Sequence, residues 1–269
     1  MRLLTGLLVL TLSILPLTEQ VHAQLRLQQI NLSKGFDQDM LGDMSGSYLI
    51  EAGRQSDMSY DYSELNLEPK DAYSWICENP HFRLGAIWVD PTKPGLEIGT
   101  NLLLITGRID EMSYRGAYTG YGTNDYLHIS QQSNELAVEA TIGYRLSGRS
   151  AWALTPLAGV NFGYHWGDVS VYGSAPVCNT NQVVWRSGSD TEAPCASQNI
   201  YDIALADGGI SARAWLGIEG SVLLFNERIE LGATLRRGLG LRTVGEAPVQ
   251  TTQLDSWSLS LGYNLFRQW

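Results

Sequence analysis

Residues 257–269, WSLSLGYNLFRQW, carry the pattern that decides the fold. Every second position is apolar or aromatic, with Arg267 as the one break, and small or polar side chains stand between them. Because successive side chains of a strand point to opposite faces, the alternation predicts a strand with one apolar face. The members of that face are Trp257, Leu259, Leu261, Tyr263, Leu265 and Trp269.

This strand resembles the last strand of small bacterial outer-membrane β-barrels, the OmpA-like and porin-family barrels. In those proteins the last strand faces lipid, pairs with the first strand and carries the terminal aromatic residue that the insertion machinery recognises. The resemblance implies that the apolar row of residues 257–269 is the membrane-insertion signal. It also implies the barrel-assembly machinery as a partner and the outer membrane of a Gram-negative bacterium as the location.

The amino-terminal residues have the three parts of a secretory signal. Arg2 precedes an apolar run over residues 3–17, and Val21-His22-Ala23 offers small residues where a signal peptidase cleaves. The run is short and interrupted for a membrane-spanning helix, although an uncleaved anchor is the alternative. We therefore expect residues 1–23 to be a signal peptide.

Composition favours a membrane interface over nucleic acid. The chain has 8 Trp and 13 Tyr against 5 Phe, and Trp and Tyr gather at membrane interfaces. A net charge of −10 argues against nucleic acid as a partner. Outer-membrane lipid and lipopolysaccharide are the expected surroundings, although an acidic exterior repels lipopolysaccharide phosphates unless divalent ions bridge them.

Alternating apolar residues mark eight strands. The sequence thus predicts an all-β fold, a transmembrane antiparallel up-and-down barrel over residues 46–269, preceded by a short periplasmic segment at 24–45. Brief alternation at Leu25–Leu27 and at Met58–Tyr62 leaves ten strands as the alternative. The expected strands are 48–52, 82–88, 96–104, 136–146, 152–166, 210–224, 229–235 and 257–269.

The connections between these strands fall into two length classes. Short turns are expected on the periplasmic side and long loops on the extracellular side, as in outer-membrane barrels. The short turns are 90–95, 147–150 and 226–227, and the long loops are 55–80, 107–133, 167–208 and 238–252. For the tyrosine-rich segment 107–133, extension of the strands beyond the membrane is the alternative to a binding loop.

Charged side chains occupy the face opposite the apolar rows. An eight-stranded barrel is only wide enough inside for side chains, and buried charges must pair. Five acids and four bases therefore predict an ion-pair plug, with a narrow gated ion path as the alternative. The predicted network comprises Glu51, Arg83, Glu97, Glu139, Arg145, Arg213, Glu219, Glu230 and Arg236.

The three cysteines match no zinc motif, and we expect neither a metal site nor a cofactor. Cys178 and Cys195 lie in one long polar segment, where a disulfide would close a loop in an oxidising compartment. Cys77 is left over in another loop, and other pairings stay open.

One His-x-Ser pair raises the question of catalysis. His128 and Ser130 resemble part of the His, Ser and Glu set of outer-membrane lipid A deacylases, but Glu135 and Glu139 have the opposite parity, so the third partner is missing from that face. His165 is expected to donate or accept hydrogen bonds at the rim or in the lumen, and His81 has no evident partner. We expect no catalytic residue.

The sequence thus predicts a non-enzymatic barrel with a structural role or with loops that bind an extracellular protein. The alternatives are a small channel or porin and, third, a deacylase-like enzyme that modifies lipid A.

Overall fold

The computed structural model describes residues 25–41, 58–62, 73–74, 77–115, 126–147, 151–177, 181–182, 196–243 and 249–266. The predicted signal peptide, the strand expected at 48–52, and Cys178 and Cys195 lie outside these residues. No helix within the described ranges is long and apolar enough to cross a membrane.

Eight long strands and two two-residue strands make up the sheet. The short ones are β2 (Tyr73–Ser74), which pairs with β4, and β6 (Leu146–Ser147), which pairs with β7. The long strands are β1 (Arg26–Leu41), β3 (Cys77–Val89), β4 (Leu96–Arg115), β5 (Tyr126–Tyr144), β7 (Trp152–Val177), β8 (Ala196–Leu224), β9 (Ile229–Arg242) and β10 (Gln250–Asn264).

The long strands close into a ring in which every neighbouring pair is antiparallel. Around the ring the order is β1, β3, β4, β5, β7, β8, β9 and β10, and β10 then pairs with β1. The closing register places Phe36 opposite Trp257 and Leu32 opposite Leu261. Chain order and ring order agree, so the predicted eight-stranded up-and-down barrel is confirmed.

The start of the barrel differs from the prediction. Residues 26–41 were expected to belong to a periplasmic segment, but they form β1, which pairs with both β10 and β3. The apolar alternation of this strand is weak because Lys34 and Gln38 stand on its outer row, so the sequence pattern there was missed. Residues 58–62 form no strand, and only Asp61 makes an isolated bridge, to Gln182.

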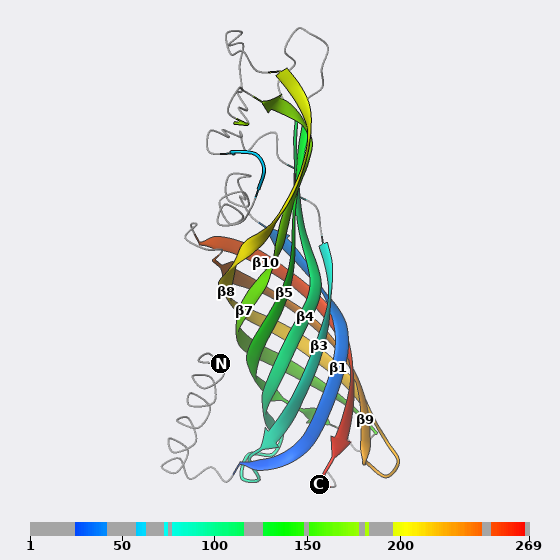
Figure 1. Ribbon diagram of the computed structural model, residues 1–269. Helices are drawn as coiled ribbons and strands as arrows, with labels where there is room; N and C mark the ends of the chain where they lie inside the picture. The colour runs from blue at the N-terminus through cyan, green and yellow to red at the C-terminus, as the bar shows by residue number, and fades with distance from the viewer. Residues whose placement is uncertain are drawn as a thin grey trace.

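The short connections lie together at one end. Figure 1 shows the β3–β4 turn, the β8–β9 turn, the beginning of β1 and the carboxy-terminus at the lower end of the barrel. The β8–β9 turn is tight, with left-handed backbone at Phe225, Asn226 and Glu227. The short turns share one end, as predicted, and by the turn-length rule for outer-membrane barrels we call this end periplasmic and the opposite end extracellular.

At the other end the strands extend far beyond the ring. The segments 107–133 and 167–208 were expected to be loops, but β4, β5, β7 and β8 continue into them, and Figure 1 shows these strands rising as a narrow sheet above the barrel. On β5 and β7 the loop prediction failed because the apolar face switches. Above the ring, inward side chains such as Leu127, Ile129 and Val171 are buried, whereas the outward row turns polar at Ser130 and Ser170.

Candidate functional site

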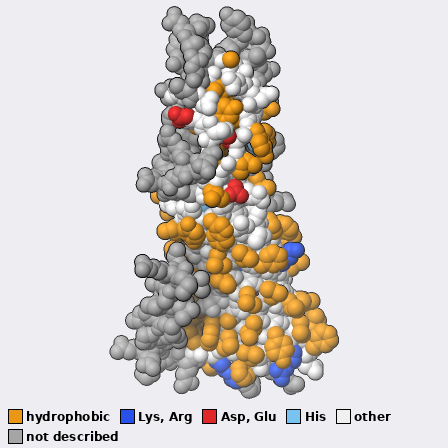
Figure 2. Space-filling view, in the orientation of Figure 1, with side chains coloured by type: hydrophobic (Ala, Val, Ile, Leu, Met, Phe, Trp, Pro, Cys, Tyr) orange, Lys and Arg blue, Asp and Glu red, His pale blue; other side chains and the backbone are white. Residues whose placement is uncertain are grey.

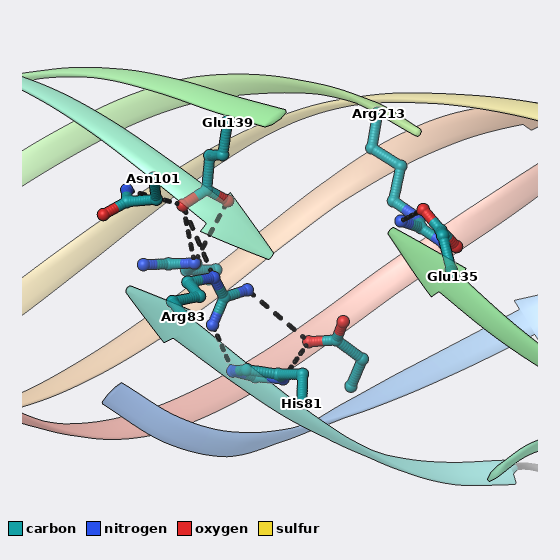
Figure 3. Close-up of polar contacts among 8 residues, drawn as sticks. His81, Arg83, Asn101, Glu135, Glu139 and Arg213 are labelled. Atoms are coloured by element: carbon teal, nitrogen blue, oxygen red, sulfur yellow. Dashed lines mark hydrogen bonds and ion pairs between the residues drawn. The ribbon is translucent and has the colours of Figure 1, made fainter. Parts of the chain in front are cut away.

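Charged side chains from non-neighbouring strands meet inside the barrel (Figure 3). In the upper lumen, Arg213 of β8 donates from Nη1 and Nη2 to the two carboxylate oxygens of Glu135 of β5, at 2.7 and 2.6 Å. The Ser211 hydroxyl donates to the same carboxylate at 2.5 Å, and the guanidinium of Arg108 lies 3.7 Å away. Glu135 was not among the predicted lumen residues, yet its carboxylate contacts three side chains in this layer.

A second carboxylate, Glu139, organises the middle layer. Its side chain is fully buried and lies 3.4 Å from Nε of Arg83 and 3.3 Å from Nη1 of Arg236, while Asn101 donates an amide hydrogen at 3.1 Å. The Arg236 guanidinium also stacks over the Trp215 ring, 4.3 Å from its centroid. One acid is therefore shared between two arginines.

Two further residues join this layer that sequence reasoning left without a role. His81 Nδ1 lies 2.9 Å from the Asp37 carboxylate, its other ring nitrogen contacts Arg83, and both side chains are buried. Asp37 belongs to β1, and because this strand was not predicted, the partner of His81 was not predicted either. Higher up, His165 Nε2 lies 2.7 Å from the Thr243 carbonyl oxygen and 3.2 Å from Arg242 Nε, inside the lumen.

The periplasmic layer is richer in acids. Arg145 lies 3.3 Å from Glu97 and 2.9 Å from Glu230, and Gln29 donates to Glu230 at 2.9 Å. Glu219 accepts a hydrogen bond from Thr234 at 2.9 Å. An enclosed cavity of about 50 Å³ separates this layer from the middle one, and its polar lining has room for a few water molecules.

The described lumen charges balance. Of the predicted residues only Glu51 lies outside the described part of the chain, and the other eight all point inward. Leu103, Ile105 and Ala137 form a buried apolar cluster beside them. The described lumen holds six acids, Asp37, Glu97, Glu135, Glu139, Glu219 and Glu230, and six bases, Arg83, Arg108, Arg145, Arg213, Arg236 and Arg242.

A second polar centre ties residues 58–62 to the extracellular part of β8. The buried Asp202 carboxylate accepts hydrogen bonds from the Ser59 hydroxyl, from the backbone N–H groups of Ser59 and Tyr60 at 3.2 Å each, and from the Tyr62 hydroxyl at 2.7 Å. Burial and the bond to Asp202 raise the pKa of Tyr62 well above its usual range. We call Asp202 with residues 59, 60 and 62 the clasp.

The outward face of the extracellular sheet carries aromatic and aliphatic side chains. Tyr201 and Leu205 are each 72 % exposed, and Ile203 lies between them on the same row. Tyr172 stands opposite Tyr201 and stacks on His128, with ring centroids 4.5 Å apart. His128 and Ser130 face outward, whereas Glu135 and Glu139 point inward, so no Glu of β5 reaches this His-x-Ser pair.

Below this sheet the barrel exterior is apolar. Figure 2 shows hydrophobic side chains covering the broad lower part, with Lys and Arg at its margins. Aromatic residues lie near both edges, Trp152 and Tyr263 toward the periplasmic end and Tyr164 and Trp166 toward the other. A closed barrel with a polar interior and an apolar exterior satisfies its backbone without water and can lie in a bilayer.

The chain therefore has the fold of a small transmembrane β-barrel. The residues expected to form its insertion signal lie on the outer row of β10, with Trp257, Leu259, Leu261 and Tyr263 exposed, while Trp269 lies outside the described part.

Comparison with known proteins finds similarity only to solved structures, at low sequence identity. No family model matches the chain, and no curated protein does. Among solved structures, Neisserial surface protein A is similar at 8% identity and TM-score 0.35, over 88% of this chain and 97% of that one. Ail of Yersinia pestis (10% identity, TM-score 0.36, 89% and 100%) and OprG of Pseudomonas aeruginosa (11%, 0.36, 90% and 97%) are similar to the same degree.

Proposed function

We propose that this barrel acts without enzymatic activity and binds a protein partner through its extracellular sheet, while ion pairs close its lumen. The observation that carries the proposal is strand length. A strand needs about 9–11 residues to cross a membrane, whereas β7 has 26 and β8 has 29. More than half of each strand is therefore available outside the bilayer.

The surface chemistry of the sheet supports protein binding. Exposed Tyr and aliphatic side chains on rigid strands supply contact area at low conformational cost. The clasp supports the same role, because it fixes residues 58–62 against the sheet and so reduces what binding must order. The surface defined by Tyr172, Tyr201, Ile203 and Leu205 is the proposed contact.

A binding experiment tests this surface. Cells displaying the full chain are incubated with immobilised extracellular-matrix and serum proteins, and the chain with Tyr201→Ser and Leu205→Ser is compared with wild type. We expect the double variant to lose binding and Asn199→Ser, on the same outward row, to retain it. Equal binding by all three, or no binding by wild type, would overturn the proposal.

The lumen half of the proposal is tested by conductance. Five of the six described lumen acids, Asp37, Glu97, Glu135, Glu139 and Glu230, each lie within ion-pair distance of an arginine, which supports a barrel that passes no ions. The full chain in planar bilayers is expected to be silent, with folding verified by heat-dependent gel mobility. The cavity beside Glu97 and Glu219 is the observation that favours a small channel instead. Discrete openings altered by Glu139→Gln would establish that channel.

The absence of enzymatic activity has its own test. Lipid A from cells expressing the chain is expected to keep its mass. A loss of one acyl chain that disappears with His128→Ala would show deacylation and overturn this part of the proposal.

A further inference from the structure

An ion pair stands on the lipid-facing wall, where charges are rare. Arg237 of β9 and Asp255 of β10 are register partners, and Arg237 Nε lies 3.4 Å from the Asp255 carboxylate. Unlike the lumen pairs, these side chains are open to the exterior, with Arg237 74% exposed. A cation is costly on the lipid face at mid-membrane and costs little at the interface, so the depth of the pair in the membrane matters.

Strand position places the pair near the outer edge of the bilayer. Arg237 is the ninth residue of β9 counted from the periplasmic turn, and Asp255 is the tenth from the periplasmic end of β10. Since about 9–11 residues span the membrane, both lie at the outer boundary. Lys34, the ninth residue of β1, also faces outward, opposite Leu259 in the register, and lies 5.4 Å over the Phe82 ring.

An apolar groove adjoins the ion pair. It has a volume of about 580 Å³ and is lined by Arg237, Asp255, Leu216, Ile218, Leu235 and Trp257. The four apolar side chains belong to the lipid-facing rows of β8, β9 and β10. The groove is therefore continuous with the surface that contacts acyl chains.

We infer that this groove, with Arg237 at its edge and Lys34 across β10, binds lipid A of lipopolysaccharide, with an acyl chain in the groove and a phosphate on Arg237. Asp255 occupies only Nε, and the two Nη groups have no partner within the described residues, so they can donate a bidentate pair of hydrogen bonds to phosphate. Lys34 adds a second cation on the other side of β10. The three side chains sum to one positive charge, so this patch attracts phosphates although the chain as a whole is acidic.

The location of the cations agrees with this ligand. Lipid A lies only in the outer leaflet, and the patch is at the outer boundary. Of the described exposed cations at the periplasmic boundary, Arg228 and Lys93 lie at turns and Arg26 lies over the Phe266 ring, and none of them lines this groove. Arg228 and Lys93 supply matched controls.

The test uses the full-length barrel in detergent, freed of lipopolysaccharide, and purified bisphosphorylated lipid A as the probe. Binding is measured by native mass spectrometry and by the shift in thermal unfolding temperature. We expect Arg237→Gln to weaken binding about tenfold, as for loss of one charge-assisted interaction, Arg237→Lys to restore part of it, and Lys34→Gln to weaken it less. Arg228→Gln and Lys93→Gln should bind like wild type.

A second comparison needs no variant. Dephosphorylated lipid A should bind wild type weakly, and phosphatidylethanolamine should not displace the bisphosphorylated form. Equal affinity for the phosphorylated and dephosphorylated lipids, or equal losses in Arg228→Gln and Arg237→Gln, would overturn the site. Heat-dependent gel mobility verifies that each variant is folded.

Discussion

Arg213 on β8 and Glu135 on β5 form a two-bonded ion pair that passes over β7, the strand between them. The two side chains can meet across β7 because the inward-facing residue of β7 next to them is Gly163, which has no side chain. A Cβ on Gly163 would lie 2.8 Å from a Glu135 carboxylate oxygen and 2.7 Å from Ala137 Cβ. The ion pair thus links three strands, and its removal is expected to weaken more than one strand pairing.

Replacing Glu135 by Ala should destabilise the barrel strongly. Arg213 and Arg108 would remain buried without their carboxylate, and such a loss costs about 3–5 kcal/mol. Unfolding by urea in lipid vesicles, followed by tryptophan fluorescence, measures the change in free energy. Arg228→Gln, which removes an exposed charge at the periplasmic turn, should cost under about 1 kcal/mol. Similar losses in both variants would contradict the assigned role of the pair.

Gly163→Ala should also destabilise, by about 1–3 kcal/mol, because the added methyl group overpacks the lumen under the ion pair. Gly220→Ala is the matched control, since a Cβ at Gly220 meets nothing within 4 Å. The same urea titration compares the two. If Gly163→Ala unfolds at the wild-type midpoint, the close packing of β7 against Glu135 is wrong.

The clasp should open at alkaline pH. Since its folded pKa is raised, Tyr62 stays neutral in the folded state while an unfolded tyrosine ionises near pH 10. The stabilisation is therefore complete below pH 10 and is lost as pH rises further. Phenolate absorbance of wild type minus that of Tyr62→Phe should show one tyrosine titrating later than the others. Titration of that tyrosine at pH 10 would show that the clasp does not hold it.

Deleting residues 26–41 should abolish folding. The deletion removes β1, so β10 and β3 each lose a pairing partner and the barrel cannot close. Heat-dependent gel mobility after refolding in detergent reports closure. A chain that begins at Gly46 and still shows this mobility would restore the shorter barrel that the sequence predicted.

The sequence predicts best those strands whose outward residues contact lipid, because hydrocarbon requires an apolar side chain at each outward position. Rows such as Leu216–Ile218 and Leu259–Leu261 face hydrocarbon, so their alternation is regular and their strands were found. β1 was missed because Lys34 and Gln38 interrupt its outer row near the membrane boundary. The upper part of β7 was read as a loop because its apolar row moves inward, to Val169 and Val171, once the strand leaves lipid.

The lumen residues could be predicted from parity alone, but their partners could not. Parity places Glu139 and Arg83 inside, yet which charges meet depends on the stagger of strands around the ring. Glu135 was considered only as a partner of the His-x-Ser pair, and Asp37 lay in a strand that was not recognised. The Asp202 clasp joins residues about 140 positions apart, a distance over which local patterns say nothing.

The balanced charges of the lumen have a consequence for salt. Six acids and six arginines cancel there, so the whole net charge of −10 belongs to the rest of the chain. Dissolved ions screen exposed charges over about 10 Å at 0.1 M ionic strength and reach buried pairs far less. When a bacterium moves between dilute and saline surroundings, the electrostatic attraction or repulsion between this protein and other molecules would therefore change. The stability that the barrel gains from its buried ion pairs would change much less.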